Sequence, residues 1–160
     1  MPHTVLVINP GSTSTKIGVF EDMKELFTEN VAHSAEEIAA FSTIASQYEF
    51  REKHIRDALH KRGFDLKKLS CIVGRGGLLK PIPGGVYKVN QAMKDEILAA
   101  KNGEHASNLG CLIAGALADE LGIPSFIVDP VVVDELSDVA RIYGHKLFRK
   151  QCIFHALNQK

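Results

Sequence analysis

A short polar loop between two apolar runs carries the groups best suited to binding an anion. The loop reads Asn9-Pro10-Gly11-Ser12-Thr13-Ser14-Thr15-Lys16 and supplies an amide, several hydroxyls and a lysine. Its glycine and small side chains let backbone N–H groups approach phosphate oxygens, and the lysine adds a full positive charge. It is not a Walker P-loop, because the Gly-x-x-x-x-Gly-Lys pattern is absent and a β-type run follows. The loop predicts a phosphate contact on a β-hairpin, with a plain polar turn as the alternative.

Arg75 lies between glycines just after a short apolar run. At the end of a strand, a guanidinium can hold a carboxylate or a phosphoryl group through two parallel hydrogen bonds. The neighbouring glycines would let a substrate approach the backbone closely. The sequence therefore predicts an anion-binding arginine, and a solvent-exposed loop arginine is the alternative.

Two further polar residues lie at the ends of expected elements. His105 precedes a helix that begins near Ser107, and a helix N-terminus favours negative charge, so the histidine is a candidate anion ligand. Alternatively, it only neighbours a capping residue. Asp129 ends a buried strand, so its carboxylate is expected at the same sheet edge as Arg75, where it can contact magnesium through water or orient a cationic side chain. The alternative is a turn aspartate before proline.

The composition is that of an ordinary globular protein. The 160 residues suit one domain, 45% are apolar, and 19 basic side chains balance 19 acidic ones. Nucleic acid and anionic membranes are therefore not the expected partners. Three widely spaced cysteines indicate neither a disulfide framework nor a zinc cluster. Without a leader sequence or a membrane-length apolar run, the chain is expected in the cytoplasm.

The elements that must position these residues alternate between strands and helices. Three early strands with short links, at 4–9, 15–21 and 25–33, predict an antiparallel meander. Later strands are expected at 69–73, 86–90 and 125–128, and helices at 44–62, 91–100 and 107–121, with helical material after the last strand. This order predicts the α/β class, with a mixed sheet of about five strands and helices on its faces.

Five segments in order resemble the butyrate kinases, a family in the acetate kinase group of the superfamily that includes sugar kinases, actin and heat-shock ATPases. The segments are the 9–16 loop, Val73-Gly74-Arg75-Gly76-Gly77-Leu78-Leu79-Lys80-Pro81-Ile82, Gly103-Glu104-His105-Ala106-Ser107-Asn108-Leu109-Gly110, Val128-Asp129-Pro130-Val131-Val132-Val133-Asp134-Glu135, and Phe154-His155-Ala156-Leu157-Asn158-Gln159-Lys160. The resemblance implies a βββαβαβα domain of the ribonuclease H-like, actin-like type. It also implies that residues 1–160 are the amino-terminal domain of an acyl kinase, with a second, nucleotide-binding domain absent from this chain.

The resemblance also implies roles for single residues. Arg75 would bind the acyl carboxylate, Asp129 would assist around magnesium or Arg75, and His105 and His155 would stabilise phosphoryl oxygens. His155 has no role without the resemblance, because its apolar surroundings indicate a packed histidine. The residues implied to bind the transferred phosphoryl group are Asn9, Gly11, Ser12, Ser14 and Lys16.

The implied reaction transfers a phosphoryl group from ATP to butyrate or a related short-chain fatty acid, giving an acyl phosphate and ADP, and it is reversible. ATP or ADP and Mg²⁺ are the implied cofactors, and a homo-oligomer is expected. The 160 residues alone are expected to be inactive, because phosphoryl transfer needs nucleotide, metal and acceptor held together. The alternatives are a noncatalytic module that binds phosphate or an acyl phosphate, and a self-associating remnant.

Overall fold

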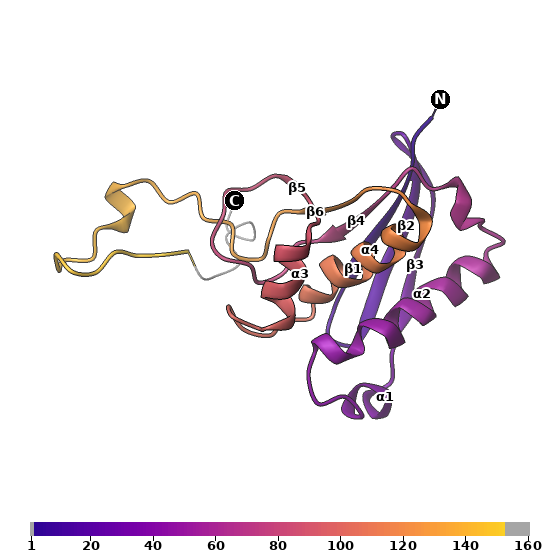
Figure 1. Ribbon diagram of the computed structural model, residues 1–160, viewed down its shortest axis with the longest axis horizontal. Coiled ribbons are helices and arrows are strands. Elements are labelled where there is room, and N and C mark those ends of the chain that lie inside the picture. Colours follow the sequence, from indigo (N-terminus) through magenta and orange to yellow (C-terminus); the bar gives the residue numbers. More distant parts are fainter. Residues whose placement is uncertain (1, 153–160) are drawn as a thin grey trace.

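The computed structural model describes residues 2–152, which form one mixed sheet with helices packed on it (Figure 1). The six strands lie in the order β3-β2-β1-β4-β6-β5. Their bounds are Thr4–Pro10 for β1, Ser14–Glu21 for β2, Lys24–Ala32 for β3, Cys71–Arg75 for β4, Val86–Lys88 for β5 and Ser125–Val128 for β6. The α/β class is confirmed, and the strand number is six because the short β5 pairs with β6 at the sheet edge.

The first three strands form the antiparallel meander that the sequence predicts. Successive side chains of a strand point to opposite faces, so apolar residues at alternate positions share one face. Leu6 and Ile8 of β1 and Ile17 and Val19 of β2 are buried in this way. The meander therefore gives the sheet one apolar face, which is buried over β1 and β2.

Strands β1, β4 and β6 run parallel to one another. Their carboxyl ends consequently meet at one edge of the sheet, where α/β folds bind ligands. Asn9 lies near the end of β1, Arg75 ends β4, and Asp129 directly follows β6. The topology thus brings together residues that are far apart in the sequence.

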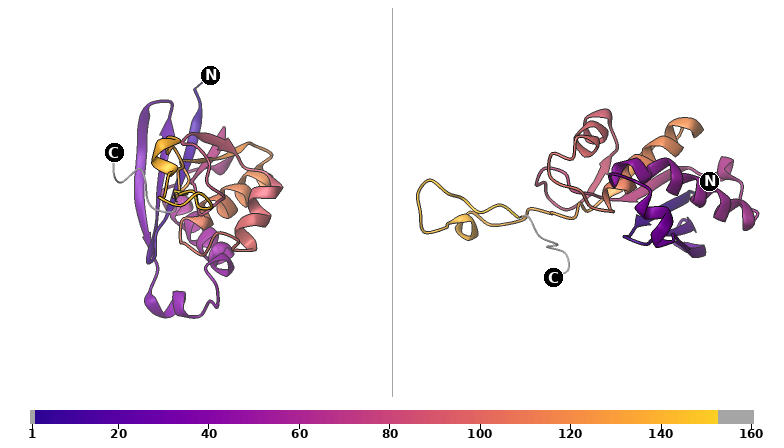
Figure 2. Two further views of the ribbon diagram at one scale, coloured as in Figure 1. Left: turned by 90° about the vertical axis from the view of Figure 1, so that its left-hand side faces the viewer. Right: turned by 90° about the horizontal axis from the view of Figure 1, so that it is seen from below.

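Two long helices, α2 (Tyr48–Lys61) and α4 (Asn108–Leu121), cover the buried face of the sheet (Figure 2). A shorter helix, α3 (Gln91–Leu98), packs on α4. The main core joins these helices to the first strands and consists of Leu6, Ile8, Ile17, Val19, Ile55, Ala58, Leu59, Leu69, Ile72, Leu109, Ile113, Ala114, Leu117 and Ala118. This core fixes both helices against the strands that carry the candidate site.

Some helix boundaries differ from the sequence prediction. The helix expected from residue 44 begins at Tyr48, after the 3-10 turn Ala45–Gln47. The short helix α1 (Ala35–Ala39) was not expected, although its start carries a capping box between Ser34 and Glu37. A five-residue helix lacks the periodic apolar stripe on which the prediction rests.

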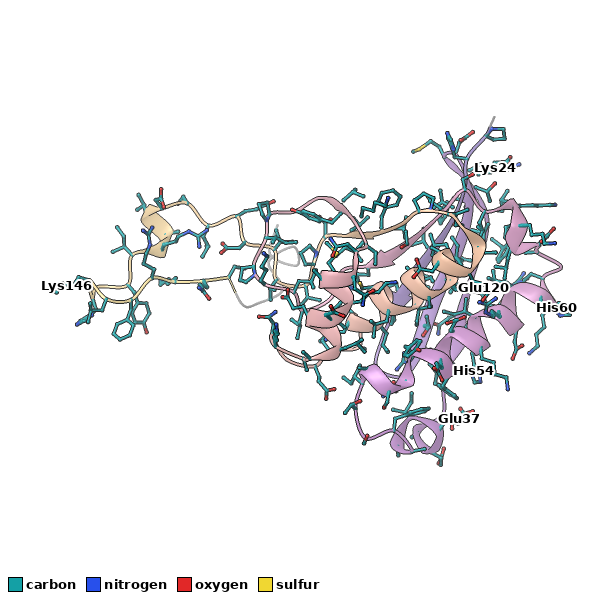
Figure 3. The ribbon with its side chains drawn as sticks, viewed as in Figure 1. Lys24, Glu37, His54, His60, Glu120 and Lys146 are labelled. Atoms are coloured by element: carbon teal, nitrogen blue, oxygen red, sulfur yellow. The ribbon has the colours of Figure 1, made fainter. Side chains whose placement is uncertain are left out.

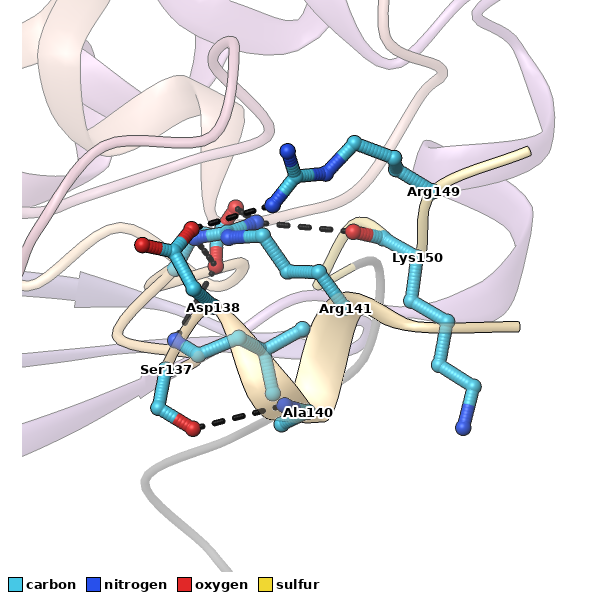
Figure 4. A network of polar contacts seen from close by, with 8 residues as sticks. Ser137, Asp138, Ala140, Arg141, Arg149 and Lys150 are labelled. Carbon is cyan, nitrogen blue, oxygen red and sulfur yellow. Dashed lines mark hydrogen bonds and ion pairs between the residues drawn. The ribbon is translucent and has the colours of Figure 1, made fainter. Parts of the chain in front are cut away.

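Beyond residue 134 the chain forms an arm that projects away from the sheet (Figure 1), and in residues 135–152 the helical content is limited to the 3-10 turn Val139–Arg141. Two ion pairs hold the arm: Arg141 pairs with Asp134 at 2.9 Å, and Arg149 with Asp138 at 3.0 Å (Figure 4). Its exposed large apolar side chains are Val139, Ile142, Tyr143, Leu147 and Phe148. The helical material expected after β6 does not form an α-helix within residues 129–152, where polar pairs and a turn at Gly144 (φ 76°) shape the chain.

No helix in the part of the chain that the structure describes is both long and apolar enough to cross a membrane. No disulfide joins cysteines among residues 2–152.

A direct backbone contact seats α4 against β4. A Cβ atom built on Gly74 would lie 2.5 Å from the carbonyl carbon of Gly110, and one built on Gly110 would overlap the carbonyl oxygen of Arg75. Only glycine at both positions allows this approach. The contact places the beginning of α4 beside the end of β4.

Replacing Gly110 with alanine should therefore destabilise the fold by about 1–3 kcal/mol, since the added methyl group would meet backbone that cannot move aside. Gly115→Ala in the same helix is the matched control, because its Cβ would meet the far end of the flexible Lys94 side chain, at 2.6 Å from Cε. Urea unfolding of the two variants measures the difference. Equal stabilities would contradict the proposed backbone contact.

Candidate active site

The polar loop connects β1 to β2 as a tight hairpin. The Gly11 N–H donates a 2.7 Å hydrogen bond to the Ser14 carbonyl, which closes the turn. Asn9 pairs directly with Lys16 across the two strands, so both side chains lie on the same face of the hairpin, and both are exposed. Ser12 is also exposed. The predicted hairpin is confirmed, and phosphate binding by it stays a prediction.

A pocket of about 490 Å³ opens at the carboxyl ends of the parallel strands. Asn9, Arg75 and Asp129 supply its polar side chains. The remaining lining residues are mostly aliphatic and are Val7, Ile8, Val73, Gly74, Val128, Pro130 and Val131. The pocket therefore combines one guanidinium with an apolar wall.

Asp129 is held in an unusual conformation beside this pocket. Its φ of 45° lies in the left-handed region, which non-glycine residues seldom adopt. The Asp129 carboxylate accepts the Gly85 N–H at 2.8 Å, and the Asp129 N–H donates to the Gly85 carbonyl at 3.0 Å. This reciprocal pair fixes the carboxylate at the sheet edge and engages one of its two oxygens.

His105 lies in the loop before α4 and lines a second pocket, of about 280 Å³, together with Ser12. Its Nδ1 is 2.7 Å from the Ser107 hydroxyl and accepts the Ser107 N–H at 3.2 Å. An Nδ1 that accepts a hydrogen bond leaves the ring proton on Nε2. Ser107 makes no capping bond with its side chain to α4, so its hydroxyl orients the histidine instead.

Five of the predicted site residues line two pockets that share no lining residue, whereas Gly11, Ser14 and Lys16 line neither. Asn9, Arg75 and Asp129 line the first, and Ser12 and His105 line the second. Both pockets lie at the end of the hairpin, because the loop contributes to each. His155 lies outside the described residues.

Sequence reasoning missed the buried side chain that links the two sides of this region. Asn108 accepts the Leu78 N–H at 2.7 Å and donates to the Gly103 carbonyl at 3.1 Å, and it is only 3% exposed. It therefore ties the loop after Arg75 to the loop before His105. Its place at a helix start is typical of a simple capping residue, and no other feature of the sequence marks it.

Arg51 is the second residue that the sequence reasoning missed. It belongs to α2, is 1% exposed and lies directly behind the hairpin loop, where it donates to loop carbonyls. Its position falls on the buried stripe of the helix, between Tyr48 and Ile55. An arginine at an apolar position of a helical pattern was the available signal.

No group of three or more His, Cys, Asp or Glu side chains that could hold a metal occurs among residues 2–152. Mg²⁺ normally keeps several waters and is held by one or two carboxylates together with substrate phosphates. The single carboxylate of Asp129 fits that mode of binding.

A buried histidine supports the hairpin from behind. His33 is 4% exposed, and its Nε2 lies 3.0 Å from the Thr15 hydroxyl. Burial, with the nearby charges of Arg51 and His54, lowers the pKa of His33 to about 4, and Glu37 opposes this effect. His54 itself lies 3.9 Å from Glu37 (Figure 3). His33 is consequently neutral in the folded protein near pH 7.

No protein-family model matches the chain, but curated proteins resemble it along its whole length. It is 55% identical over 160 residues to a probable butyrate kinase from Clostridium botulinum, which covers 100% of the chain and 45% of that protein. It is 52% identical over 158 residues to butyrate kinase 1 from Clostridium acetobutylicum, covering 99% of the chain and 44% of that protein. The chain spans less than half the length of these relatives.

Solved structures of acyl kinases share the fold at low sequence identity. Acetate kinase from Porphyromonas gingivalis superposes with a TM-score of 0.54 at 15% identity, over 90% of this chain and 41% of that one. Propionate kinase from Francisella tularensis gives 0.50 at 14% identity, over 89% and 41%. The fold expected from the family resemblance is confirmed.

The lowered pKa of His33 has a consequence for acid stability. The unfolded chain binds a proton at this histidine near pH 6.5, whereas the folded chain does so only near pH 4. Stability is therefore fully present above pH 6.5 and falls as the pH drops towards 4, by about 2 kcal/mol between pH 7 and pH 5.

Urea unfolding at a series of pH values measures this dependence. His33→Gln, which retains a hydrogen-bonding group for Thr15, should remove most of it, and His60→Gln on the exposed face of α2 should leave it unchanged. A His33→Gln protein with the same pH dependence as the parent would contradict the assignment.

Proposed function

We propose that this chain, which belongs along its whole length to the butyrate kinase family, forms part of a site that transfers a phosphoryl group between ATP and the carboxylate of butyrate. The reaction gives butyryl phosphate and ADP and is reversible. The observation that carries the proposal is the 55% identity over all 160 residues to a protein named as a probable butyrate kinase. Because the chain spans 45% of that protein, the activity is proposed for the protein that contains this chain.

The first pocket supports a short fatty carboxylate as the acceptor. Arg75 provides a planar pair of donors that matches a carboxylate, and an ammonium group could not reproduce this geometry. Val7, Val73, Val128 and Val131 surround it with aliphatic surface that suits an alkyl chain. In this proposal the acyl group lies among the valines, with its carboxylate on Arg75.

The hairpin supports binding of the transferred phosphoryl group. Asn9, Ser12, Ser14 and Lys16 would contact the phosphoryl oxygens, and His105 and His155 would neutralise charge that develops on them. Gly11 would serve by shaping the turn, because its N–H is already bonded to the Ser14 carbonyl. A fatty carboxylate is already ionised at neutral pH, so the reaction requires no strong general base. The side chains would act by positioning the reactants and neutralising charge.

ATP with Mg²⁺ completes the proposed site. Bound magnesium would neutralise charge on the nucleotide phosphates. Asp129 would face it through a water molecule, because one carboxylate oxygen is already bonded to the Gly85 N–H. The proposal includes a cytoplasmic location and a homo-oligomeric state, and the exposed apolar side chains of the arm favour self-association.

Arg75→Lys in the complete reading frame that contains this chain should reduce kcat/KM for butyrate by about 2–4 kcal/mol in free-energy terms, because the forked grip on the carboxylate is lost. Arg62→Lys, at an exposed ion pair with Glu29, is the matched control and should leave the kinetics unchanged. Coupled assays of ADP formation measure both variants. Parental kinetics in Arg75→Lys would count against a direct role for this residue.

The 160-residue chain alone should form no measurable butyryl phosphate from butyrate, ATP and magnesium, while the complete reading frame should be active. Trapping the acyl phosphate with hydroxylamine detects the product in both samples. Comparable activity of the two proteins would show that these residues suffice for catalysis. Phosphate binding without activity in either protein would favour the noncatalytic module.

A further inference from the structure

Arg51 is a buried arginine whose hydrogen bonds all go to neutral groups. Its Nε and Nη2 donate to the Gln47 amide oxygen at 3.1 and 2.8 Å. The remaining acceptors belong to the hairpin loop: the carbonyl of Gly11 at 2.7 Å, that of Ser12 at 3.0 Å, that of Ser14 at 3.2 Å and the hydroxyl of Thr15 at 3.3 Å. Every N–H-bearing nitrogen of the guanidinium therefore has an acceptor within the protein.

These contacts determine which polar groups the loop presents outwards. A carbonyl oxygen that pointed into an anion site would repel phosphate oxygens. Arg51 binds the carbonyls of Gly11, Ser12 and Ser14 from the interior of the protein. Carbonyls engaged in this way are turned away from an anion on the outer side of the loop, as a phosphate site requires.

Arg51 forms no ion pair within the described chain, although the Glu104 carboxylate lines the same small pocket. None of the ion pairs among residues 2–152 includes Arg51, although Arg56 on the same helix pairs with both Glu52 and Glu120. Burial lowers the pKa of Arg51, yet an arginine keeps its proton in proteins. A buried charge without a partner is costly, and a bound anion would relieve that cost.

We infer that Arg51 is a positioning residue for a phosphoryl group: it shapes the hairpin loop from behind and keeps an unneutralised positive charge for an anion bound on the outer side. It touches no ligand itself, because its donors are occupied. This inference rests on the proposed function for the identity of the anion, but its physical content concerns binding of any phosphate by the loop. Gln47 is part of the arrangement, since a neutral acceptor there holds the guanidinium without cancelling its charge.

The decisive variant is Gln47→Glu, made in the complete reading frame. Glutamate keeps the acceptor position of the amide oxygen and adds the missing counter-charge, so the fold should be as stable as the parent or more stable. Inorganic phosphate, titrated calorimetrically, should nevertheless bind about tenfold more weakly, and its affinity should depend less on salt. A purely structural role for Arg51 predicts unchanged phosphate binding in this variant.

Two further variants separate geometry from charge. Arg51→Lys keeps the charge but cannot reach all loop carbonyls, so phosphate affinity should fall at least threefold, and loop amide resonances should shift. Arg56→Gln is the control on the same helix and should bind phosphate as the parent does. Kinetic assays should show a raised KM for butyryl phosphate in Gln47→Glu with a smaller change in kcat.

Parental phosphate affinity in folded Gln47→Glu would overturn the inference, and so would a parent protein that binds no phosphate. If the parent binds phosphate with the expected variant pattern but phosphorylates no fatty acid, the inference stands and the proposed function fails. If the parent phosphorylates butyrate but Gln47→Glu binds phosphate as tightly as the parent does, the proposed function stands and the inference fails.

Discussion

The backbone contact between Gly74 and Gly110 is the constraint on which the geometry of this site depends. It brings the beginning of α4 so close to β4 that no side chain fits between them. Asn108, two residues earlier, can then bond both the loop after Arg75 and the loop before His105. A shift of α4 by the width of a methyl group would move both loops, so the positions of Arg75 and His105 relative to each other depend on this contact.

Parallel strands and connecting loops contribute differently to the site. Strand ends fix Asn9 and Arg75 through ladder hydrogen bonds, and the first pocket follows directly from the order β1-β4-β6. Loops supply His105 and the residues of the hairpin turn, which need additional polar contacts to hold their shape. Ser107 and Asn108 provide those contacts on one side, and Arg51 provides them on the other.

The regular part of the fold could be predicted from the sequence because apolar residues recur there at the spacing of strands and helices. The antiparallel meander, the buried stripe of α4 and the strand at Ser125–Val128 follow from spacing alone. The arm after β6 did not follow, since ion pairs such as Arg141 with Asp134 depend on tertiary placement. The division of the candidate site into two pockets was equally hidden, because periodicity assigns a residue to a face and not to a cavity.

An arginine at an apolar position of a helical pattern, such as Arg51, indicates a buried charge, and a buried charge matters for anion binding in this chain. A chain with 19 basic and 19 acidic side chains has no net charge to attract phosphate from a distance, so attraction must come from local placement. Exposed cations such as Lys16 and Arg75 are screened by salt, whereas a buried guanidinium is screened much less. The proposed arrangement therefore separates two tasks: exposed side chains would make the contacts with an anion, and the buried arginine would supply a field that salt weakens much less.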